Sequence, residues 1–227
     1  MSIGYAREID NYYYEYFDSL IIRKRTPKYY RKYLDHILEH KKMVYTAWIY
    51  IQDTLCELGF ISEDDVYPIF ELVACHDESK LEIDEFIPYA KRFNGPKPKD
   101  LTVKENFKAA VMLHKMRNPH HYESLKKRRG ENWKHYAVEL ICDYIAMGWE
   151  FNNYICEYFE VVKEELKNAL PEEYYNFIES VISIIPERLS LAEEPLTENN
   201  IGYIYHLYDY HNDPFEEEEP QAEKKLV

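Results

Sequence analysis

One long stretch, residues 26–59, most constrains what this chain can fold into. Thr26 with Pro27 makes a favourable helix start, and Gly59 makes a favourable stop. Between them, apolar residues recur at the spacing of one helix face: Ile37, Val44, Trp48, Ile51, Leu55 and Leu58. The 227 residues include only 6 glycines, and long periodic segments with little glycine indicate a mostly helical protein.

Similar patterns along the rest of the chain predict further helices. Ser62 with Asp65 resembles a capping box at one helix start, and Pro119 stops another helix. Residues 123–132 read as a basic loop. The expected helices cover residues 3–19, 26–59, 62–77, 80–95, 101–118, 133–166 and 171–185.

Neither an internal repeat nor a shift in composition divides the chain before residue 190. We therefore expect an all-α fold with one domain over residues 1–211 and a core at about 28–185. The helices bearing His40 and Asp143 are expected to pack side by side. An acidic, proline-containing segment at 212–227 is expected to be disordered.

The composition of the chain limits the classes of molecule that it is expected to bind and the compartment in which it is expected to work. A net charge of -14 disfavours non-specific binding of DNA or RNA, while a small anionic substrate remains open if its site carries cations. No apolar run is long enough to span a membrane, and the N-terminus lacks the layout of a signal peptide. Four widely spaced cysteines are interpreted as reduced core residues of a cytoplasmic protein: Cys56, Cys75, Cys142 and Cys156.

Several polar residues interrupt otherwise apolar helical segments. His40 lies in the apolar stripe of the segment 26–59, and the pair His76-Asp77 follows the apolar run "PIFELVA". Asp143 sits within "AVELICDYIAMGW", one turn after Glu139. Each has a simple structural explanation: a lone core histidine is usually hydrogen-bonded, and a buried carboxylate such as Asp143 needs a salt bridge or several donors.

Taken together, these residues predict a metal site. Two histidines and two aspartates from separate helices give the mixed nitrogen and oxygen ligands that suit Mn, Fe, Co or Ni, with Mg also considered. The predicted ligands are His40, His76, Asp77 and Asp143. A metal with open positions lowers the pKa of its water and supplies a hydroxide nucleophile.

The order "H…HD…D" on successive helices resembles the HD-domain superfamily of metal-dependent phosphohydrolases. The match covers roughly residues 33–160, and "HDESK" with "NPHH" also resembles a small, poorly characterised branch of HD-like proteins found largely in bacteria and their phages. The resemblance implies a single HD-domain-like helical bundle that binds one or two divalent ions. It also implies that His114, with His120 or His121, holds a second ion or contacts substrate phosphate.

The resemblance further implies an enzyme, a phosphohydrolase that acts on a nucleotide or another small phosphate ester through a metal-bound hydroxide. Asp77, Lys80 and His114 are the expected catalytic residues, and Lys80, Ser79 and Arg128 the expected substrate-binding residues. Lys80 can equally be a surface lysine paired with Glu78 or Asp84.

Two other functions remain open from the sequence. Some HD-fold proteins use a di-iron site for oxygen-dependent chemistry, and this chain has enough histidines and aspartates to supply such a site. A tyrosine-rich acidic helical protein can also bind a partner without catalysis and keep a closed structural metal.

Overall fold

The computed structural model describes residues 27–96, 101–130, 132–151 and 155–185. The expected first helix at 3–19, Thr26 and the acidic tail at 212–227 lie outside these residues. The described part of the chain is all-α and contains no strand. Its elements are α2 (Lys28–Glu57), α3 (Glu63–Ala74), the 3₁₀ turn η1 (Glu78–Leu81), α4 (Ile83–Phe93), α5 (Leu101–Arg117), α6 (Tyr122–Leu125), α7 (Trp133–Phe151), α8 (Ile155–Ala169) and α9 (Glu172–Ile184).

The end of α2 and the start of α3 follow the expected local signals. Gly59 adopts a positive φ of 72° just after α2, where the backbone N–H of Phe60 bonds to the carbonyl of Leu55 at 2.9 Å. At the start of α3, the Asp65 carboxylate accepts bonds from the backbone N–H and the hydroxyl of Ser62, at 2.8 and 2.6 Å. The predicted capping box is therefore confirmed.

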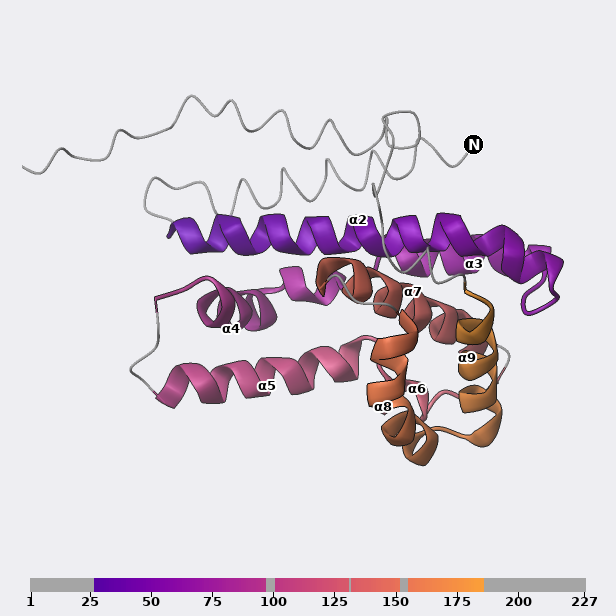
Figure 1. The fold of residues 1–227 in the computed structure, drawn as a ribbon. Helices are drawn as coiled ribbons and strands as arrows, with labels where there is room; N and C mark the ends of the chain where they lie inside the picture. The colour runs from indigo at the N-terminus through magenta and orange to yellow at the C-terminus, as the bar shows by residue number, and fades with distance from the viewer. Residues whose placement is uncertain (1–26, 97–100, 131, 152–154, 186–227) are drawn as a thin grey trace, which may run out of the picture.

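Helix α2 runs along one side of the described part of the molecule (Figure 1). It packs against α3, α4 and α7, so the helices bearing His40 and Asp143 lie side by side, as expected. Helix α5 packs on α4, while α8 and α9 pack on α7. No helix among the described residues is long and apolar enough to cross a membrane.

Two separate apolar clusters form the core. The larger one contains Val44, Trp48 and Ile51 of α2 with buried residues of α3, α7, α8 and α9. The smaller one joins the N-terminal half of α2 to η1, α4 and α5: Tyr33, Ile37, Leu81, Phe86, Tyr89, Ala90 and Ala110. His40 lies between Ile37 and Val44, so α2 carries this histidine across the boundary between the two clusters.

The expected long helix at 133–166 is wrong in its extent, because α7 and α8 are separate helices. One straight helix over these residues would be about 50 Å long. Instead, α8 packs back against α6, α7 and α9, which buries Phe159 and Leu166 in the larger cluster. Residues 152–154, between the two helices, lie outside the described residues; their sequence "NNY" includes two asparagines, which are poor helix formers.

The interpretation of the cysteines as core residues needs correction. All four are free, but only Cys142 is buried; Cys56 is partly buried, and Cys75 and Cys156 are exposed. Cys75 directly follows the end of α3, and Cys156 lies on the solvent side of the first turn of α8. The apolar neighbours in the sequence did not reveal which face each cysteine occupies.

Replacing a fully buried residue of α7 should destabilise the whole domain. We expect Ile141→Ala to lower the free energy of unfolding by about 2–5 kcal/mol, because Ile141 is 0% exposed and the substitution leaves a cavity. Urea denaturation followed by circular dichroism measures this change. The control Val161→Ala, at an 80% exposed position, should change it by no more than about 0.5 kcal/mol. Equal losses in both variants would contradict the packing of α7.

Candidate metal centre

The His76-Asp77 pair lies in a tight turn after α3, rather than within the helix. Helix α3 ends at Ala74, and Asp77 adopts the left-handed conformation with φ 57° and ψ 21°. Asp77 is the one residue other than glycine with positive φ in the described part of the chain, and aspartate tolerates this region better than most residues. The turn directs the chain into η1, where the N–H of Lys80 bonds to the Asp77 carbonyl at 2.9 Å.

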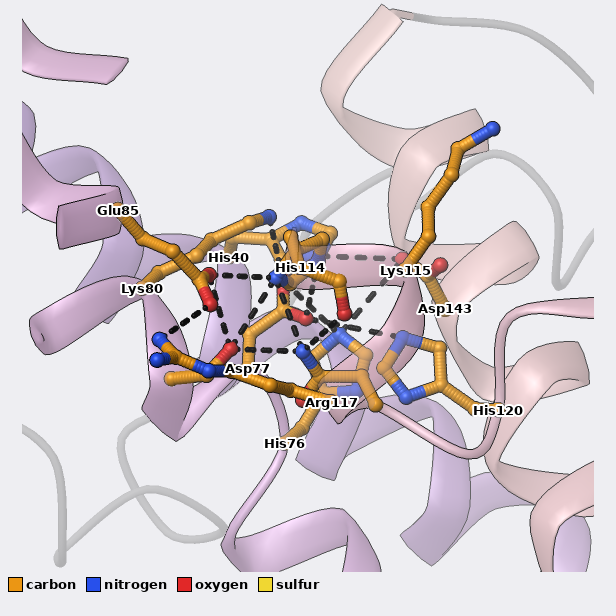
Figure 2. Close-up of polar contacts among 12 residues, drawn as sticks. His40, His76, Asp77, Lys80, Glu85, His114, Lys115, Arg117, His120 and Asp143 are labelled. Carbon is orange, nitrogen blue, oxygen red and sulfur yellow. Dashed lines mark hydrogen bonds and ion pairs between the residues drawn. The ribbon is translucent and has the colours of Figure 1, made fainter. Parts of the chain in front are cut away.

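The structure brings the four predicted ligands together at this turn (Figure 2). His40 comes from the middle of α2, and its Nε2 lies 3.1 Å from Oδ1 of Asp143 on α7. Nε2 of His76 lies 3.8 Å from the same oxygen. Oδ2 of Asp77 lies 3.5 Å from Nε2 of His76 and 4.0 Å from Nε2 of His40. We call the group of His40, His76 and Asp143, with Oδ2 of Asp77, position A.

The other oxygen of Asp77 faces a second group of histidines. Oδ1 of Asp77 lies 3.1 Å from Nε2 of His114, at the end of α5, and 3.6 Å from Nε2 of His120. A ring nitrogen of His121 lies within 4.8 Å of one donor atom from each of these three residues. We call the group of Asp77, His114, His120 and His121 position B. Both histidines of the "NPHH" segment therefore face the centre.

The donor atoms at these positions are suited to a metal ion. Several are buried and have no hydrogen-bond partner among the described residues: Oδ1 of Asp77 and Nε2 of His76, His114, His120 and His121. Nε2 of His114 is close to Oδ1 of Asp77, but the two atoms are not aligned as a hydrogen bond. Buried polar atoms are normally satisfied, so unsatisfied ones gathered at one point need an explanation. Both groups can hold a metal ion.

Buried or half-buried carboxylates face the opposite edges of four imidazoles. Nδ1 of His76 and of His120 each lie 3.0 Å from Glu139, and Nδ1 of His114 lies 2.9 Å from Glu85. Nδ1 of His40 lies 3.6 Å from Glu150. A carboxylate behind an imidazole fixes the ring orientation and raises its basicity as a ligand, an arrangement typical of metal-binding histidines.

These supporting carboxylates were not predicted as site residues. Glu139 was noted only as a neighbour of Asp143, and Glu85 and Glu150 carried no signal beyond their charge. The one available indication was the apolar context of Glu139 in "AVELIC", since a carboxylate there needs a partner. Pairing Glu85 with His114 requires the packing of α4 on α5, and pairing Glu150 with His40 requires the packing of α7 on α2.

The three residues expected to bind substrate have different positions. Lys80 pairs directly with Oδ2 of Asp77, and not with Glu78 or Asp84. The Ser79 hydroxyl donates to Glu85 at 2.9 Å and accepts from Nδ2 of Asn118 at 2.7 Å, so this side chain supports Glu85 inside the protein.

The structure does not bring Arg128 to either position. Its side chain is exposed, and its guanidinium lies over the ring of Tyr136, 5.4 Å from the centroid. Its backbone carbonyl accepts a hydrogen bond from the Tyr174 hydroxyl. The basic loop therefore packs beside α7 and α9, because the chain turns away from the centre after α6. The expectation of Arg128 as a substrate contact is not supported by this placement.

The dense packing of acids and imidazoles shifts several pKa values. Burial lowers the pKa of His40, but the nearby carboxylates of Asp143 and Glu150 outweigh burial and raise the pKa to about 9. Burial is likewise outweighed at His120, where the charge of Glu139 raises the pKa to about 9. Burial, with the charges of His120 and His114, lowers the pKa of His121 to about 2. Burial would raise the pKa of Asp77, but His76, Lys80 and His114 hold it well below the ordinary value.

The metal-free protein should therefore lose stability as the pH rises from about 6.5 to about 8.5. His40 and His120 have folded-state pKa values of about 9 against an ordinary 6.5, so their protonation stabilises the fold fully below pH 6.5. This contribution is lost as the pH rises toward 9, by at most about 1.4 kcal/mol per pH unit for each group. Urea denaturation in the presence of a chelator measures the slope.

Affinity for a divalent ion should change in the opposite direction, because an imidazole must be neutral to bind a metal. Calorimetric titration with Mn²⁺ should show tighter binding at pH 8.5 than at pH 6.5. His36→Gln is the control for stability, because burial lowers the pKa of the half-exposed His36, the opposite direction to the shifts of His40 and His120. A stability that rises with pH in the metal-free protein would contradict the assignment of His40 and His120.

Comparison with known proteins gives a family but not an activity. The model of a family described as "Family of unknown function (DUF5662)" matches residues 29–184, which include every residue of positions A and B. No curated protein and no solved structure gives a significant match. Because the family model covers well over half of the sequence, this chain belongs to the DUF5662 family, whose function is unknown.

Proposed function

We propose that this protein is a metal-dependent phosphohydrolase that acts on a nucleotide or another small phosphate ester, with a centre of the HD-domain kind. The observation that carries the proposal is the position of Asp77, whose two oxygens face two separate groups of histidine donors. A carboxylate between two ions is suited to hold them close together, as two-metal hydrolases require. The order of the donors along the chain, His40, His76-Asp77, His114, His120-His121 and Asp143, agrees with the resemblance in the sequence.

The ligand set favours Mn, Fe, Co or Ni over Ca, because imidazole nitrogens outnumber carboxylate oxygens. Mg prefers oxygen ligands and suits the centre less well. When bound, such an ion supplies a Lewis acid for phosphoryl oxygens and lowers the pKa of water.

Lys80 is the residue of this chain best placed to contact the phosphate. Its ammonium group pairs with Asp77, and its side chain keeps 21% exposure, so it lies at the solvent side of the centre. The ammonium has three donors and no lone pair, so it can donate to an anionic oxygen but does not bind a metal. We assign His114 to position B and not to proton transfer, because Glu85 holds its Nδ1 and directs its Nε2 toward Asp77.

The partial exposure of the centre favours an enzyme over a closed structural metal site. Asp143 and Lys80 keep 13% and 21% side-chain exposure, whereas His76 and Glu85 are fully buried. A structural metal site is normally closed on all sides by protein ligands. The centre is therefore buried on the side of His76 and Glu85 and partly exposed on the side of Asp143 and Lys80, and the exposed side gives a substrate access to the donors.

A di-iron oxygenase is the second candidate, and the number of donors favours it. Positions A and B together offer seven side chains, enough for two iron ions with a shared carboxylate. The metal content of protein purified under air, together with oxygen consumption, separates the two functions. Two iron ions with oxygen uptake and no phosphate release would support the oxygenase.

Removing the charge of Asp77 should abolish metal binding and hydrolysis together. We expect Asp77→Asn to reduce bound Mn²⁺ at both positions, since one carboxylate oxygen serves each. Asparagine tolerates the left-handed backbone, so the turn itself is preserved. Metal analysis and phosphate release from a panel of nucleotides measure the two effects. Full metal content in this variant would refute the shared role of Asp77.

Removing the ammonium of Lys80 should separate metal binding from turnover. Lys80→Met keeps most of the aliphatic stem, so Mn²⁺ content should remain while phosphate release falls by about 100-fold or more, as when one charge-stabilising donor is lost. Lys32→Met, on an exposed part of α2, is the matched control and should change neither quantity. Unchanged turnover in Lys80→Met would exclude Lys80 from the reaction.

A further inference from the structure

Glu139 occupies a special place among the carboxylates around the centre. It lies on α7, one turn before Asp143, and is only 4% exposed. Its Oε1 accepts a hydrogen bond from Nδ1 of His76 at 3.0 Å, and Nδ1 of His120 lies 3.0 Å from the same oxygen. The rings of His76 and His120 lie against each other, with centroids 4.4 Å apart. One oxygen therefore serves one histidine of position A and one of position B.

We infer that Glu139 is a positioning residue that orients both positions at once and links metal binding at one to metal binding at the other. An ion at position A fixes the ring of His76, which fixes Glu139, which in turn holds His120 ready for position B. The inference rests on the metal-binding part of the proposed function and is independent of hydrolysis.

The neighbouring carboxylates lack this double contact. Glu150 faces Nδ1 of His40, which belongs to position A alone. Glu85 bonds to Nδ1 of His114, which belongs to position B alone, and also accepts from Ser79 and Arg117. The three carboxylates therefore form a natural set: one for position A, one for position B and one shared. This difference gives matched control variants within the same chain.

The alternative role for Glu139 is that of a metal ligand, since His76, His120 and Glu139 form a third group of donors within 4.8 Å of one another. Two observations favour the positioning role. The Nδ1 of His76 is already used in a hydrogen bond to Glu139. The Nε2 atoms of both histidines, by contrast, are buried without a partner and face Asp77. Nδ1 of His120 also lacks an aligned hydrogen bond, but it lies at the same 3.0 Å from Glu139 as the bonded Nδ1 of His76, so both rings present Nδ1 to Glu139 and Nε2 to Asp77.

The experiment is a titration of the metal-free full chain with Mn²⁺, followed by calorimetry and electron paramagnetic resonance. The unmodified protein should bind two ions and give the signal of a coupled pair. Glu139→Gln should weaken both binding steps by about 10- to 100-fold, the usual effect of losing a partner behind a metal ligand, and should lose the coupled signal at limiting Mn²⁺. Glu150→Gln and Glu85→Gln should each weaken one step only.

Each outcome decides between the alternatives. If Glu139→Gln weakens one step, or if both control variants weaken two steps, the link through Glu139 is refuted. Three ions in the unmodified protein and two in Glu139→Gln would make Glu139 a ligand and also refute it. If the unmodified protein binds no Mn²⁺, the metal-binding part of the proposed function fails first, which is a distinct result.

A structural role for Glu139 alone would not change the resonance signal in a folded variant. Far-ultraviolet circular dichroism of the metal-free variants shows whether they fold. Glutamine is the chosen replacement because it keeps the volume of the side chain and one acceptor oxygen, so the imidazoles keep a neutral partner. If Glu139→Gln does not fold, Glu139→Asp provides the second variant. Aspartate keeps the charge but reaches less far, so one of the two binding steps should recover while the other stays weak; two unweakened steps would refute the link.

Discussion

The structure depends on a carboxylate, that of Asp77, buried between imidazoles. A buried charge of this kind costs several kcal/mol unless it is paired on all sides. Lys80 and the Nε2 atoms of four histidines face its two oxygens. These imidazoles need acceptors of their own, which Glu85, Glu139 and Glu150 supply. Each charged group of the polar centre therefore depends on a partner of opposite charge. The left-handed backbone of Asp77, in the turn after α3, places its carboxylate among these partners.

The location of this centre follows from the two apolar clusters. Helix α2 contributes Ile37 to the smaller cluster and Val44 to the larger one, and His40 lies between them. The donors come from three helices, α2, α5 and α7, and from two turns, so none of the binding positions exists before these elements pack (Figures 1 and 2). Their rigid apolar surroundings hold each imidazole in one orientation, which is the condition for selective metal binding.

Charge gives a second reason to expect a cation at this place. The centre and its immediate support contain five carboxylates, from Asp77, Glu85, Glu139, Asp143 and Glu150, against the fixed positive charges of Lys80 and Arg117. In the metal-free protein the balance is made by protons, which explains why the pKa values of His40 and His120 are raised. A divalent ion can replace these protons. An acidic protein can then present a local positive charge to an anionic substrate despite its net charge of -14.

The sequence by itself determined the all-α class, the C-terminal end of α2, the capping box of α3 and the inward direction of His40, because helical periodicity and capping are local properties. It also singled out His76, Asp77 and Asp143 as donors, since polar residues beside or within apolar segments need a partner when they are buried; the "NPHH" histidines were expected at the centre only from the family resemblance. Only the tertiary structure decided that Ser79 supports Glu85, that Arg128 lies away from the centre, and that α7 and α8 are separate helices. Above all, it decided the pairing of Glu139 with two imidazoles, one 63 positions away in sequence, because such a contact depends on how helices pack and not on the spacing within any one of them.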